Sequence, residues 1–368
     1  MVENSGWSEI RSNLDWIMLF CTLALFGLGL STVYSASPVV RGASYYYAVR
    51  QLVWGGIGAV FYLAILRIGY KKILSVAVPF FALIVILLIS LDLAGYTAKG
   101  AQRWFNLGFV RFQPSEHGKI AFTMILSVLC VKLPPDTVKG FFSVLGISFF
   151  TVGLIMLQPD LGSSIIYLVI MFTILFVAGT PYKILSGMAV AGAASLPLLW
   201  SVLRPYQRMR LLVFFDPWID PQGAGYNVIQ SRIAVGSGGL LGKGFLRGTQ
   251  GKLHFLPEPH TDFIFSVFSE EFGFVGCAVV LLLFAVLLWR IISTARYSRD
   301  MQAKLLAAGI AAWIWFQVLE SVAMSMGLAP VTGLPLPLFS YGGSAMLSVL
   351  MALAIVQSIA IMSKEGRY

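Results

Sequence analysis

The feature that most constrains this chain is a series of apolar runs, most of them long enough to cross a lipid bilayer as a helix. A membrane-spanning helix needs about 20 apolar residues. Of the 368 residues, 58% are hydrophobic and only 11% are charged, whereas a soluble globular domain carries roughly 25% charged residues. The sequence therefore predicts an integral membrane protein.

The apolar runs predict a single all-α membrane domain, residues 1–368, with about ten transmembrane helices. The second run is short, and we expect its helix to extend back through Val49–Gln51. Segment 204–262 becomes a large extracytoplasmic loop between helices 7 and 8, and residues 1–13 and 363–368 are short terminal segments. The ten predicted spans are Leu14–Tyr34, Leu52–Leu66, Ile73–Leu93, Ser115–Val131, Phe141–Leu157, Leu161–Ala178, Ile184–Leu203, Phe263–Trp289, Leu305–Met326 and Ser344–Met362.

Basic residues in the short connecting segments predict the orientation of the chain. Lys and Arg are enriched in cytoplasmic loops, and a cytoplasmic N-terminus places more of them inside than outside. Glu3, Glu9 and Asp15 do not resemble the basic start of a signal peptide. Both termini are therefore predicted to be cytoplasmic.

The sequence shows no disulfide framework and no zinc motif. Cys21, Cys130 and Cys277 lie in separate apolar runs, and the three histidines form no HExxH pair.

The basic residues left on the outside gather in two segments, 99–119 and 204–252. An anionic ligand on the outer side would explain them, and contact with lipid headgroups is the plainer alternative. In the first segment Pro114 suits a helix start, and Glu116 and Lys119 are spaced to pair on one helix face. Such a pair could also simply neutralise itself at the membrane edge, and Arg103 with Trp104 could be an interfacial anchor.

The second segment, 204–262, combines cations with a glycine-rich stretch, residues 236–244. Glycine-rich backbone with Arg and Lys predicts a cradle for a diphosphate. The Walker pattern fails because Gly244 rather than Ser or Thr follows Lys243, so ATP binding is not predicted. The cations expected to face the diphosphate are Arg103, Arg204, Arg208, Arg210, Lys243 and Lys252.

Carboxylates mark three further places. Asp160 follows Pro159 in a break between two spans, where we expect a tight turn with Asp160 capping the next helix. Asp262 stands where the eighth span begins, as a candidate general base or as a helix N-cap. Glu270 lies eight residues further on, so it and Asp262 could face one cavity, and with Glu271 it is costly deep in a span.

Segment Gly327–Ser344 carries three prolines and several glycines, which are incompatible with a regular helix. Non-helical backbone at the membrane boundary must be buried in protein or line a cavity. We therefore expect a re-entrant wall beside the outer site.

These segments, in this order, resemble the SEDS family (shape, elongation, division and sporulation proteins), and its RodA-like members most. The specific stretches are Gln113–Glu116, His260–Phe265, Pro330–Pro337 and Ser340–Ser344. The resemblance implies a ten-span peptidoglycan glycosyltransferase in the bacterial cytoplasmic membrane. Such an enzyme polymerises lipid II on the outer face, in elongation and control of cell shape, beside a class B penicillin-binding protein.

By the matching motif, Asp262 is implied to be the essential acid, with Trp104, Glu116 and Lys119 around the same cavity. A divalent cation, Mg²⁺ or Mn²⁺, is a candidate cofactor, and nucleic acid is not an expected partner. Other residues expected to contact the substrate are Tyr206, Gln207, Gln250, His260, Thr261, Ser340 and Tyr341.

Two departures from the family pattern stand out. His254 occupies a position that is commonly acidic, which puts any assistance from that residue in doubt, and Ser321 and Ala323 replace the usual Asn and Gly.

Two other functions remain open. A lipid II flippase would use the intramembrane carboxylates, although no inverted repeat is visible. A non-catalytic scaffold for a penicillin-binding protein would leave Asp262 and the arginines unexplained.

Overall fold

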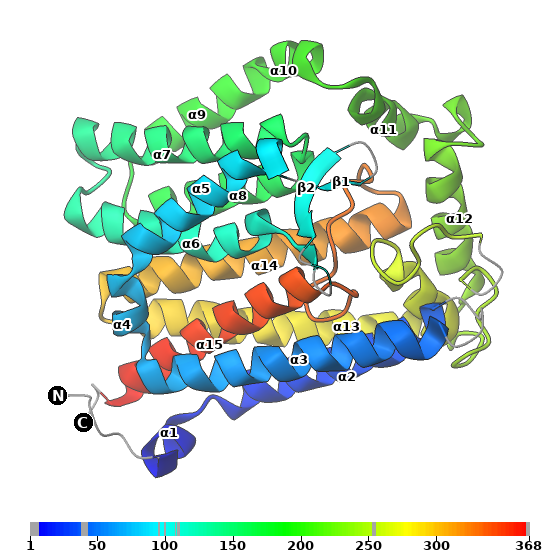
Figure 1. The fold of residues 1–368 in the computed structure, drawn as a ribbon, viewed down its shortest axis with the longest axis horizontal. Coiled ribbons are helices and arrows are strands. Elements are labelled where there is room, and N and C mark those ends of the chain that lie inside the picture. The colour runs from blue at the N-terminus through cyan, green and yellow to red at the C-terminus, as the bar shows by residue number, and fades with distance from the viewer. Residues whose placement is uncertain are drawn as a thin grey trace.

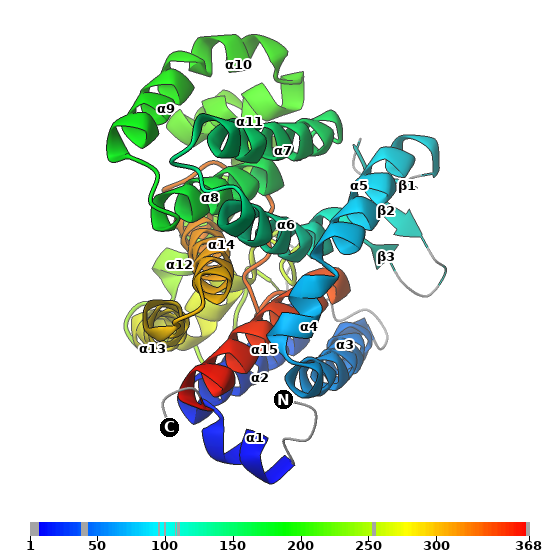
Figure 2. The same cartoon turned by 90° about the vertical axis from the view of Figure 1, so that its left-hand side faces the viewer.

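The computed structural model describes residues 7–37, 43–94, 96–98, 101–106, 108, 111–251 and 255–365 (Figure 1). Three residues named from the sequence, Glu3, Lys252 and His254, and the first residue of segment 99–119, Lys99, lie outside this range. The described chain is almost entirely helical, as the sequence predicts, and its long helices lie side by side in one bundle (Figures 1 and 2).

Nine long helices of the described chain form the bundle, and shorter ones lie around it (Figure 1). The long helices are α2 (Trp16–Ala36), α3 (Ala43–Ile68), α5 (Ala77–Ala94), α6 (Pro114–Lys132), α7 (Val138–Leu157), α8 (Leu161–Val177), α13 (Ile264–Tyr297), α14 (Met301–Met326) and α15 (Gly343–Glu365). The shorter ones are α1 (Trp7–Asn13), α4 (Tyr70–Ser75), α9 (Tyr182–Ala194), α10 (Leu196–Val202), α11 (Pro205–Phe215), the 3₁₀ turn η1 (Pro217–Ile219) and α12 (Ala224–Ser237).

Within the described residues, six helices are long and apolar enough to cross a membrane: α2, α3, α7, α13, α14 and α15. Two shorter apolar segments, Ala77–Leu91 and Leu161–Val177, match predicted spans. The predicted seventh span, Ile184–Leu203, is divided at Ser195 into α9 and α10. The chain is thus a polytopic membrane protein, and the count of ten spans stays a prediction.

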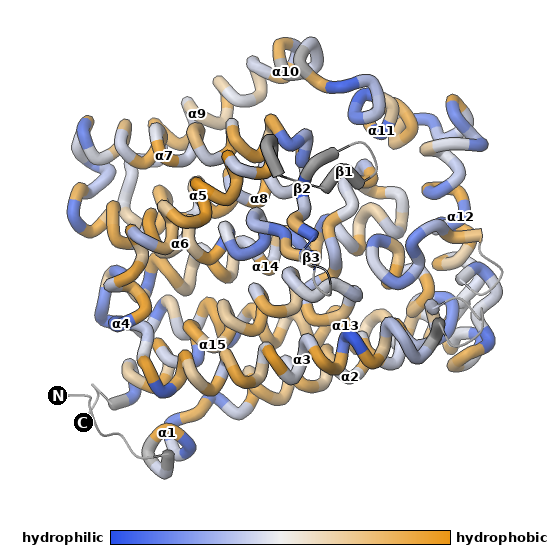
Figure 3. Tube along the Cα trace, viewed as in Figure 1, coloured by the Kyte–Doolittle hydropathy of each residue, from blue (hydrophilic) through white to orange (hydrophobic). Residues whose placement is uncertain are grey.

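The centre of the bundle is α14 and α15, the most buried of the six long apolar helices. Helix α14 contacts α13, α8 and α6, and α15 packs along α3. Apolar residues fill the long helices, and polar ones concentrate at the bundle ends (Figure 3). Apolar side chains such as Phe20, Ile86 and Phe149 stay exposed on the outer helices, as expected for surfaces that face lipid.

Capping residues fix where several helices begin. The side chain of Asp160 accepts a hydrogen bond from the Ser163 backbone N–H at 3.2 Å, which confirms the predicted turn and cap before α8. Asp15 and Asp300 cap α2 and α14 in the same way, and Pro114 starts α6 as predicted. Each such cap stabilises its helix by about 1 kcal/mol.

Helix α13 is broken at Gly273, whose φ of 63° is left-handed. A loop from the end of α12 fills the break. The N–H groups of Lys243 and Gly244 donate to the carbonyls of Glu270 and Glu271, at 2.9 and 3.0 Å, and Phe274 N–H donates to Gly239 at 2.9 Å. The backbone is therefore satisfied at a place where an open break in lipid would be costly.

Both ends of the described chain lie at one end of the bundle (Figures 1 and 2). Lys364, in the last turn of α15, donates to the backbone carbonyl of Asn13 at 3.0 Å, just before α2 begins. Arg290 near the end of α13 pairs with Asp15 at 2.6 Å. We call this the terminal end, and the opposite end, where α6, α8, α13 and α15 begin, the site end.

Two non-helical segments lie at the site end. Strands β1 (Tyr96–Ala98), β2 (Ala101–Asn106) and β3 (Arg111–Phe112) form an antiparallel sheet in the order β1-β2-β3, which the sequence analysis does not anticipate. Residues 328–342 contain no helix, which confirms the expected irregular segment. We call residues 328–342 the proline segment.

Candidate functional site

Asp262 lies at the site end, half-buried, immediately before α13. It is not the N-cap, because that position is taken by Phe263, which makes no side-chain capping bond. A side-chain carbon built on Gly333 would come within 3.3 Å of the Asp262 carboxylate. Asp262 therefore lies directly against the proline segment, at a point where the chain has no side chain.

The two residues before Asp262 are held by the end of the proline segment. The Ser340 hydroxyl donates to the Thr261 carbonyl at 2.8 Å, and the Tyr341 N–H donates to the His260 carbonyl at 3.0 Å. The His260 ring stacks on Tyr47, with centroids 4.3 Å apart. Four residues predicted near the site, His260, Thr261, Ser340 and Tyr341, thus act here through backbone positioning and stacking.

Buried amides satisfy the backbone of the proline segment. Gln51 donates to the Ser340 carbonyl at 3.0 Å, and Gln317 donates to the Pro335 carbonyl at 2.7 Å. Both amides are fully buried, so these bonds are made away from water and are costly to lose. The segment is therefore a fixed wall of the site.

A second carboxylate, Glu320 of α14, lies near Asp262 and interacts with it electrostatically. Glu320 accepts a hydrogen bond from the Thr332 hydroxyl, next to Gly333. Its other oxygen is buried without a hydrogen-bond partner. In the sequence Glu320 is one of the intramembrane carboxylates that the flippase alternative would use, and a carboxylate inside an apolar helix is costly enough to mark it as a candidate site residue.

The arginines of α11 and of its N-cap differ in their contacts. Arg210 reaches the proline segment, donating to the carbonyls of Val331 at 3.1 Å and Thr332 at 3.5 Å. Arg208 instead donates to the Ser201 carbonyl at 2.8 Å and lies over Trp200. Arg204, at the N-cap of α11, is exposed. Arg210 is therefore the α11 cation nearest to Asp262.

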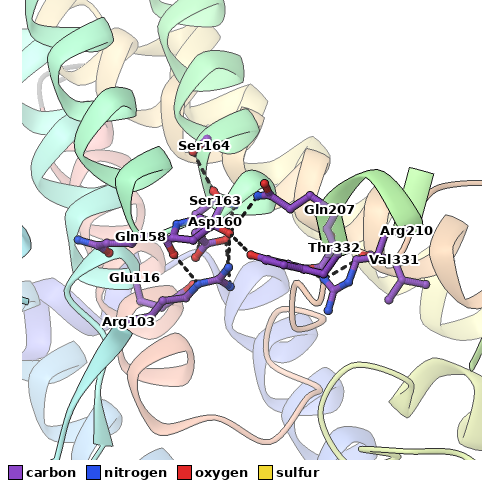
Figure 4. A network of polar contacts seen from close by, with 12 residues as sticks. Arg103, Glu116, Gln158, Asp160, Ser163, Ser164, Gln207, Arg210, Val331 and Thr332 are labelled. Atoms are coloured by element: carbon purple, nitrogen blue, oxygen red, sulfur yellow. Dashed lines mark hydrogen bonds and ion pairs between the residues drawn. The ribbon is translucent and has the colours of Figure 1, made fainter. Parts of the chain in front are cut away.

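Arg103 of β2 approaches from the other side (Figure 4). Its Nε donates to the Gln158 carbonyl at 2.9 Å, another nitrogen donates to Pro159, and the guanidinium lies 3.7 Å from Asp160. The α11 side chains Tyr206 and Gln207 also donate to the Pro159 carbonyl, at 3.0 and 3.2 Å. The Pro159 carbonyl thus accepts hydrogen bonds from three predicted site residues, which come from β2 and α11.

A small pocket of about 30 Å³ lies among these groups. It has room for roughly two water molecules, so a diphosphate enters only if side chains move apart. The pocket is lined by Arg103, Pro159, Leu161, Gly162, Tyr206, Gln207, Arg210, Leu211, Pro330, Val331 and Thr332.

Glu116 and Lys119 form the ion pair that their spacing predicts, at 2.8 Å. Lys119 is completely buried, and its ammonium also donates to Gln317 at 3.2 Å and lies over the Trp313 ring. Because Gln317 in turn holds the Pro335 carbonyl, the pair braces the proline segment from inside. Trp104, also predicted near the cavity, is half-buried on β2.

The glycine-rich stretch does not form the open cradle that the sequence suggests. Its Lys243 and Gly244 N–H groups are bonded to α13, and a side-chain carbon on Gly242 would lie 2.1 Å from the Glu271 carbonyl oxygen. Close packing against the broken helix, rather than anion binding, explains the glycines. Lys252 lies outside the described residues.

Glu270 is turned toward this loop, where the Lys243 ammonium pairs with it at 2.6 Å. The Thr249 hydroxyl and N–H and the Gln250 N–H also donate to its carboxylate, at 2.8, 2.9 and 3.0 Å. Glu270 thus ties the loop after α12 to α13, and the second carboxylate with a charge interaction with Asp262 is Glu320.

The bond between Thr332 and Glu320 gives a first prediction. We expect Thr332→Val to lower the free energy of unfolding by about 1–3 kcal/mol, because the Glu320 carboxylate then loses its hydrogen-bond donor while buried. Thermal unfolding in detergent measures the effect. The double variant Glu320→Leu/Thr332→Val is the control, since it removes both polar groups. Equal stability of Thr332→Val and the original chain would contradict the prediction.

The chemistry available at the site end follows from these positions. A half-buried carboxylate can accept a proton from a nearby hydroxyl. The guanidinium groups of Arg103 and Arg210, which line the pocket together with Thr332, can stabilise a departing phosphate or diphosphate. Among the described residues, no group of three or more His, Cys, Asp or Glu side chains is arranged to hold a metal ion.

Comparison with known sequences gives matches along almost the whole chain. The model of the FtsW, RodA and SpoVE cell cycle proteins matches residues 15–365. Peptidoglycan glycosyltransferase MrdB of Escherichia coli K12 is 38% identical over 359 residues, which cover 97% of this chain and 95% of MrdB. Stage V sporulation protein E of Bacillus subtilis is 36% identical, over 97% of this chain and 99% of that protein.

Solved structures share the fold. A chain of a peptidoglycan synthase complex that coordinates polymerisation and crosslinking matches with a TM-score of 0.82 and 31% identity, covering 95% of this chain and 98% of that one. The crystal structure of the rod shape determining protein RodA of Thermus thermophilus matches with a TM-score of 0.71 and 30% identity, covering 94% and 96%.

Proposed function

This chain belongs to the FtsW, RodA and SpoVE family of cell cycle proteins, and on that premise we propose that Asp262 is the general base with which it polymerises lipid II. The chain is a peptidoglycan glycosyltransferase, like the relatives that carry this name. It acts in synthesis of the cell wall. What the proposal adds is the assignment of roles to the residues of the site end.

The reaction needs one proton acceptor. Asp262 takes the proton of the acceptor 4-hydroxyl as that oxygen bonds to C1 of the donor sugar, and the bond from C1 to the lipid diphosphate breaks. Diphosphate leaves as an anion, so the leaving group needs no general acid. The arrangement corresponds to the base half of an inverting glycosidase. Arg210 and Arg103 stabilise the charge that develops on the diphosphate.

One observation carries this assignment. The proline segment holds Arg210 at the carbonyls of Val331 and Thr332, and the next residue, Gly333, lies against the Asp262 carboxylate. The cation Arg210 and the base Asp262 thus contact neighbouring residues of the proline segment, Thr332 and Gly333. Since the pocket beside Arg210 is small, diphosphate binding includes release of Arg103 from the Pro159 carbonyl.

A divalent cation at the site end would be held by Asp262 and by the partnerless oxygen of Glu320. It would supply additional charge stabilisation to the diphosphate.

The protein is an integral protein of the bacterial cytoplasmic membrane. Its site end faces outward and both termini face the cytoplasm, an orientation supported by the Lys and Arg of the short loops and by the position of both termini opposite the site. A class B penicillin-binding protein, which crosslinks the strands, is its partner. The matching chain in a complex that coordinates polymerisation and crosslinking supports this pairing.

Polymerisation of purified lipid II tests the function. The protein, with its penicillin-binding partner, is given lipid II and the products are sized on a gel. Long glycan strands are the expected result. Movement of lipid II across vesicles without polymer would favour a flippase, and polymer formed only by the partner would favour a scaffold.

The role of Arg210 gives a second prediction. Arg210→Gln is expected to lower kcat/KM for lipid II by about tenfold to a hundredfold, since a charge-assisted hydrogen bond of about 1.5–3 kcal/mol is lost. Arg247→Gln, on the same outer loop but exposed and outside the pocket, is the matched control. A loss of equal size in the control would show that the effect is one of general surface charge.

A further inference from the structure

A second cavity, of about 430 Å³, lies at the terminal end of the bundle, opposite to the site. Its lining comes from the last turns of α13 and α15 and from the start of α2, which lie next to one another in Figure 2. The volume is within the roughly 300–1,000 Å³ typical of small-molecule sites. None of the proposed chemistry uses this cavity.

The cavity is cationic. Arg290, Arg296 and Lys364 line it, and Asp15 is its only acidic lining residue. The Asp15 carboxylate is already engaged, since one oxygen accepts from Arg290 at 2.6 and 2.7 Å and the other caps α2. Asp15 therefore neutralises Arg290 alone.

The other two cations keep their charge. Lys364 donates to the backbone carbonyls of Asn13 and Leu14, at 3.0 and 3.4 Å, which fixes the ammonium without neutralising it. Arg296 is exposed and lies over the ring of Tyr297, 5.8 Å from its centre. Within the described part of the chain, no ion pair engages either residue.

The plain alternative is that these residues only follow the general bias of Lys and Arg toward one side of the membrane. That bias does not explain why the cations line a cavity. It also does not explain why Ser293 and Ser363, which are further hydrogen-bond donors, line the same cavity. The C-terminal ends of α13 and α15 carry partial negative charge, so the backbone does not attract an anion to this cavity. The attraction comes from the cationic side chains.

The rim of the cavity carries exposed apolar side chains. Trp289 is 62% exposed and Ile292 is 54% exposed, and both line the cavity beside Arg290. Large apolar side chains at this height in a membrane protein contact the acyl chains and headgroup region of lipid. An anion with acyl chains fits both parts of the lining, whereas a free anion fits only the cations.

We propose that this cavity binds the phosphate headgroup of an anionic membrane phospholipid, held by Arg296 and Lys364. Basic pockets between membrane helices are a recurring form of headgroup site. The inference rests on the cavity and its charges, so it stands apart from the assignment of Asp262 and from the orientation of the chain.

Native mass spectrometry tests the proposal, with the purified protein in detergent titrated with phosphatidylglycerol or phosphatidylcholine. The protein is expected to retain phosphatidylglycerol in preference. Arg296→Gln should weaken this binding about fivefold, and Arg296→Gln/Lys364→Gln about 25-fold, from about a factor of five for each cation. The single variant leaves the Lys364 contacts with Asn13 and Leu14 intact, so it tests binding even if the double variant is poorly folded.

The matched control is Lys71→Gln/Arg299→Gln, which removes two exposed charges outside the cavity. It should bind as tightly as the original chain. An equal loss in this control, or equal retention of phosphatidylcholine, would overturn the site. Binding of inorganic phosphate as tight as that of phosphatidylglycerol would overturn the assignment to a lipid.

Discussion

Replacing Asp262 by Asn is expected to lower the rate of lipid II polymerisation by about a hundredfold to ten-thousandfold, the usual contribution of a positioned base. Asn has nearly the same shape but cannot accept the proton of the acceptor hydroxyl. Because Asp262 lies against Gly333 without serving as the cap of α13, the substitution should leave the fold intact. Polymer length and initial rate, measured with purified protein and its partner, give the result.

Two measurements make that result specific. Unfolding temperature in detergent should be nearly the same for Asp262→Asn and the original chain, which separates lost chemistry from lost structure. Lipid II binding should also persist, since the cations that face the diphosphate are untouched. Polymer made at the original rate by Asp262→Asn would reject Asp262 as the base and leave the family assignment standing.

The largest expected effect on stability comes from Lys119. Lys119→Met should lower the free energy of unfolding by about 3–5 kcal/mol, because Glu116 is left as a buried carboxylate without its counter-ion. Gln317 also loses one of the two donors to its carbonyl oxygen, Trp313 being the other. Thermal unfolding in detergent, with a fluorescent readout, measures the change.

The double variant Glu116→Gln/Lys119→Met is the matched control, since it removes both charges at once. Most of the lost stability should return, because no buried charge remains unpaired. If the double variant is stable but makes little polymer, the pair has a role at the substrate beyond bracing the proline segment. If it is as unstable as Lys119→Met alone, the ion pair is not the cause of the loss.

Local signals in the sequence were sufficient for several parts of the site. Pro114 marks the start of α6, Asp160 the cap of α8, and the spacing of Glu116 and Lys119 their ion pair. Each of these depends on residues within one helical turn, where spacing alone decides which groups can meet. The prolines of residues 328–342 likewise exclude a helix without any knowledge of the surrounding fold.

Contacts between distant segments could not be predicted in this way. Nothing in the sequence places Glu320 near Asp262, because Glu320 lies on α14 and Asp262 precedes α13, and the packing of these two helices decides whether the residues approach each other. The same is true of Pro159, whose carbonyl collects Arg103, Tyr206 and Gln207. The sequence identified most of these residues by type, and the fold decides which of them share a partner.

The glycine-rich loop shows how a correct observation can support a wrong interpretation. Glycines beside Lys243 fit a diphosphate cradle, but they equally fit a backbone that must approach another backbone closely. Only the position of the Glu271 carbonyl, which a side chain on Gly242 would meet, distinguishes the two. A break inside α13 has no strong signature either, since Gly276, three residues after Gly273, does not interrupt the helix.

The interruption at Gly273 divides α13 into a short first portion that follows Asp262 and a long second portion that continues to Tyr297. Hydrogen bonds to residues 239–244 replace the helical ladder across the gap. A displacement of residues 239–244 would therefore act first on the short portion next to the acid, because the helical ladder that would pass it on to the long portion is interrupted.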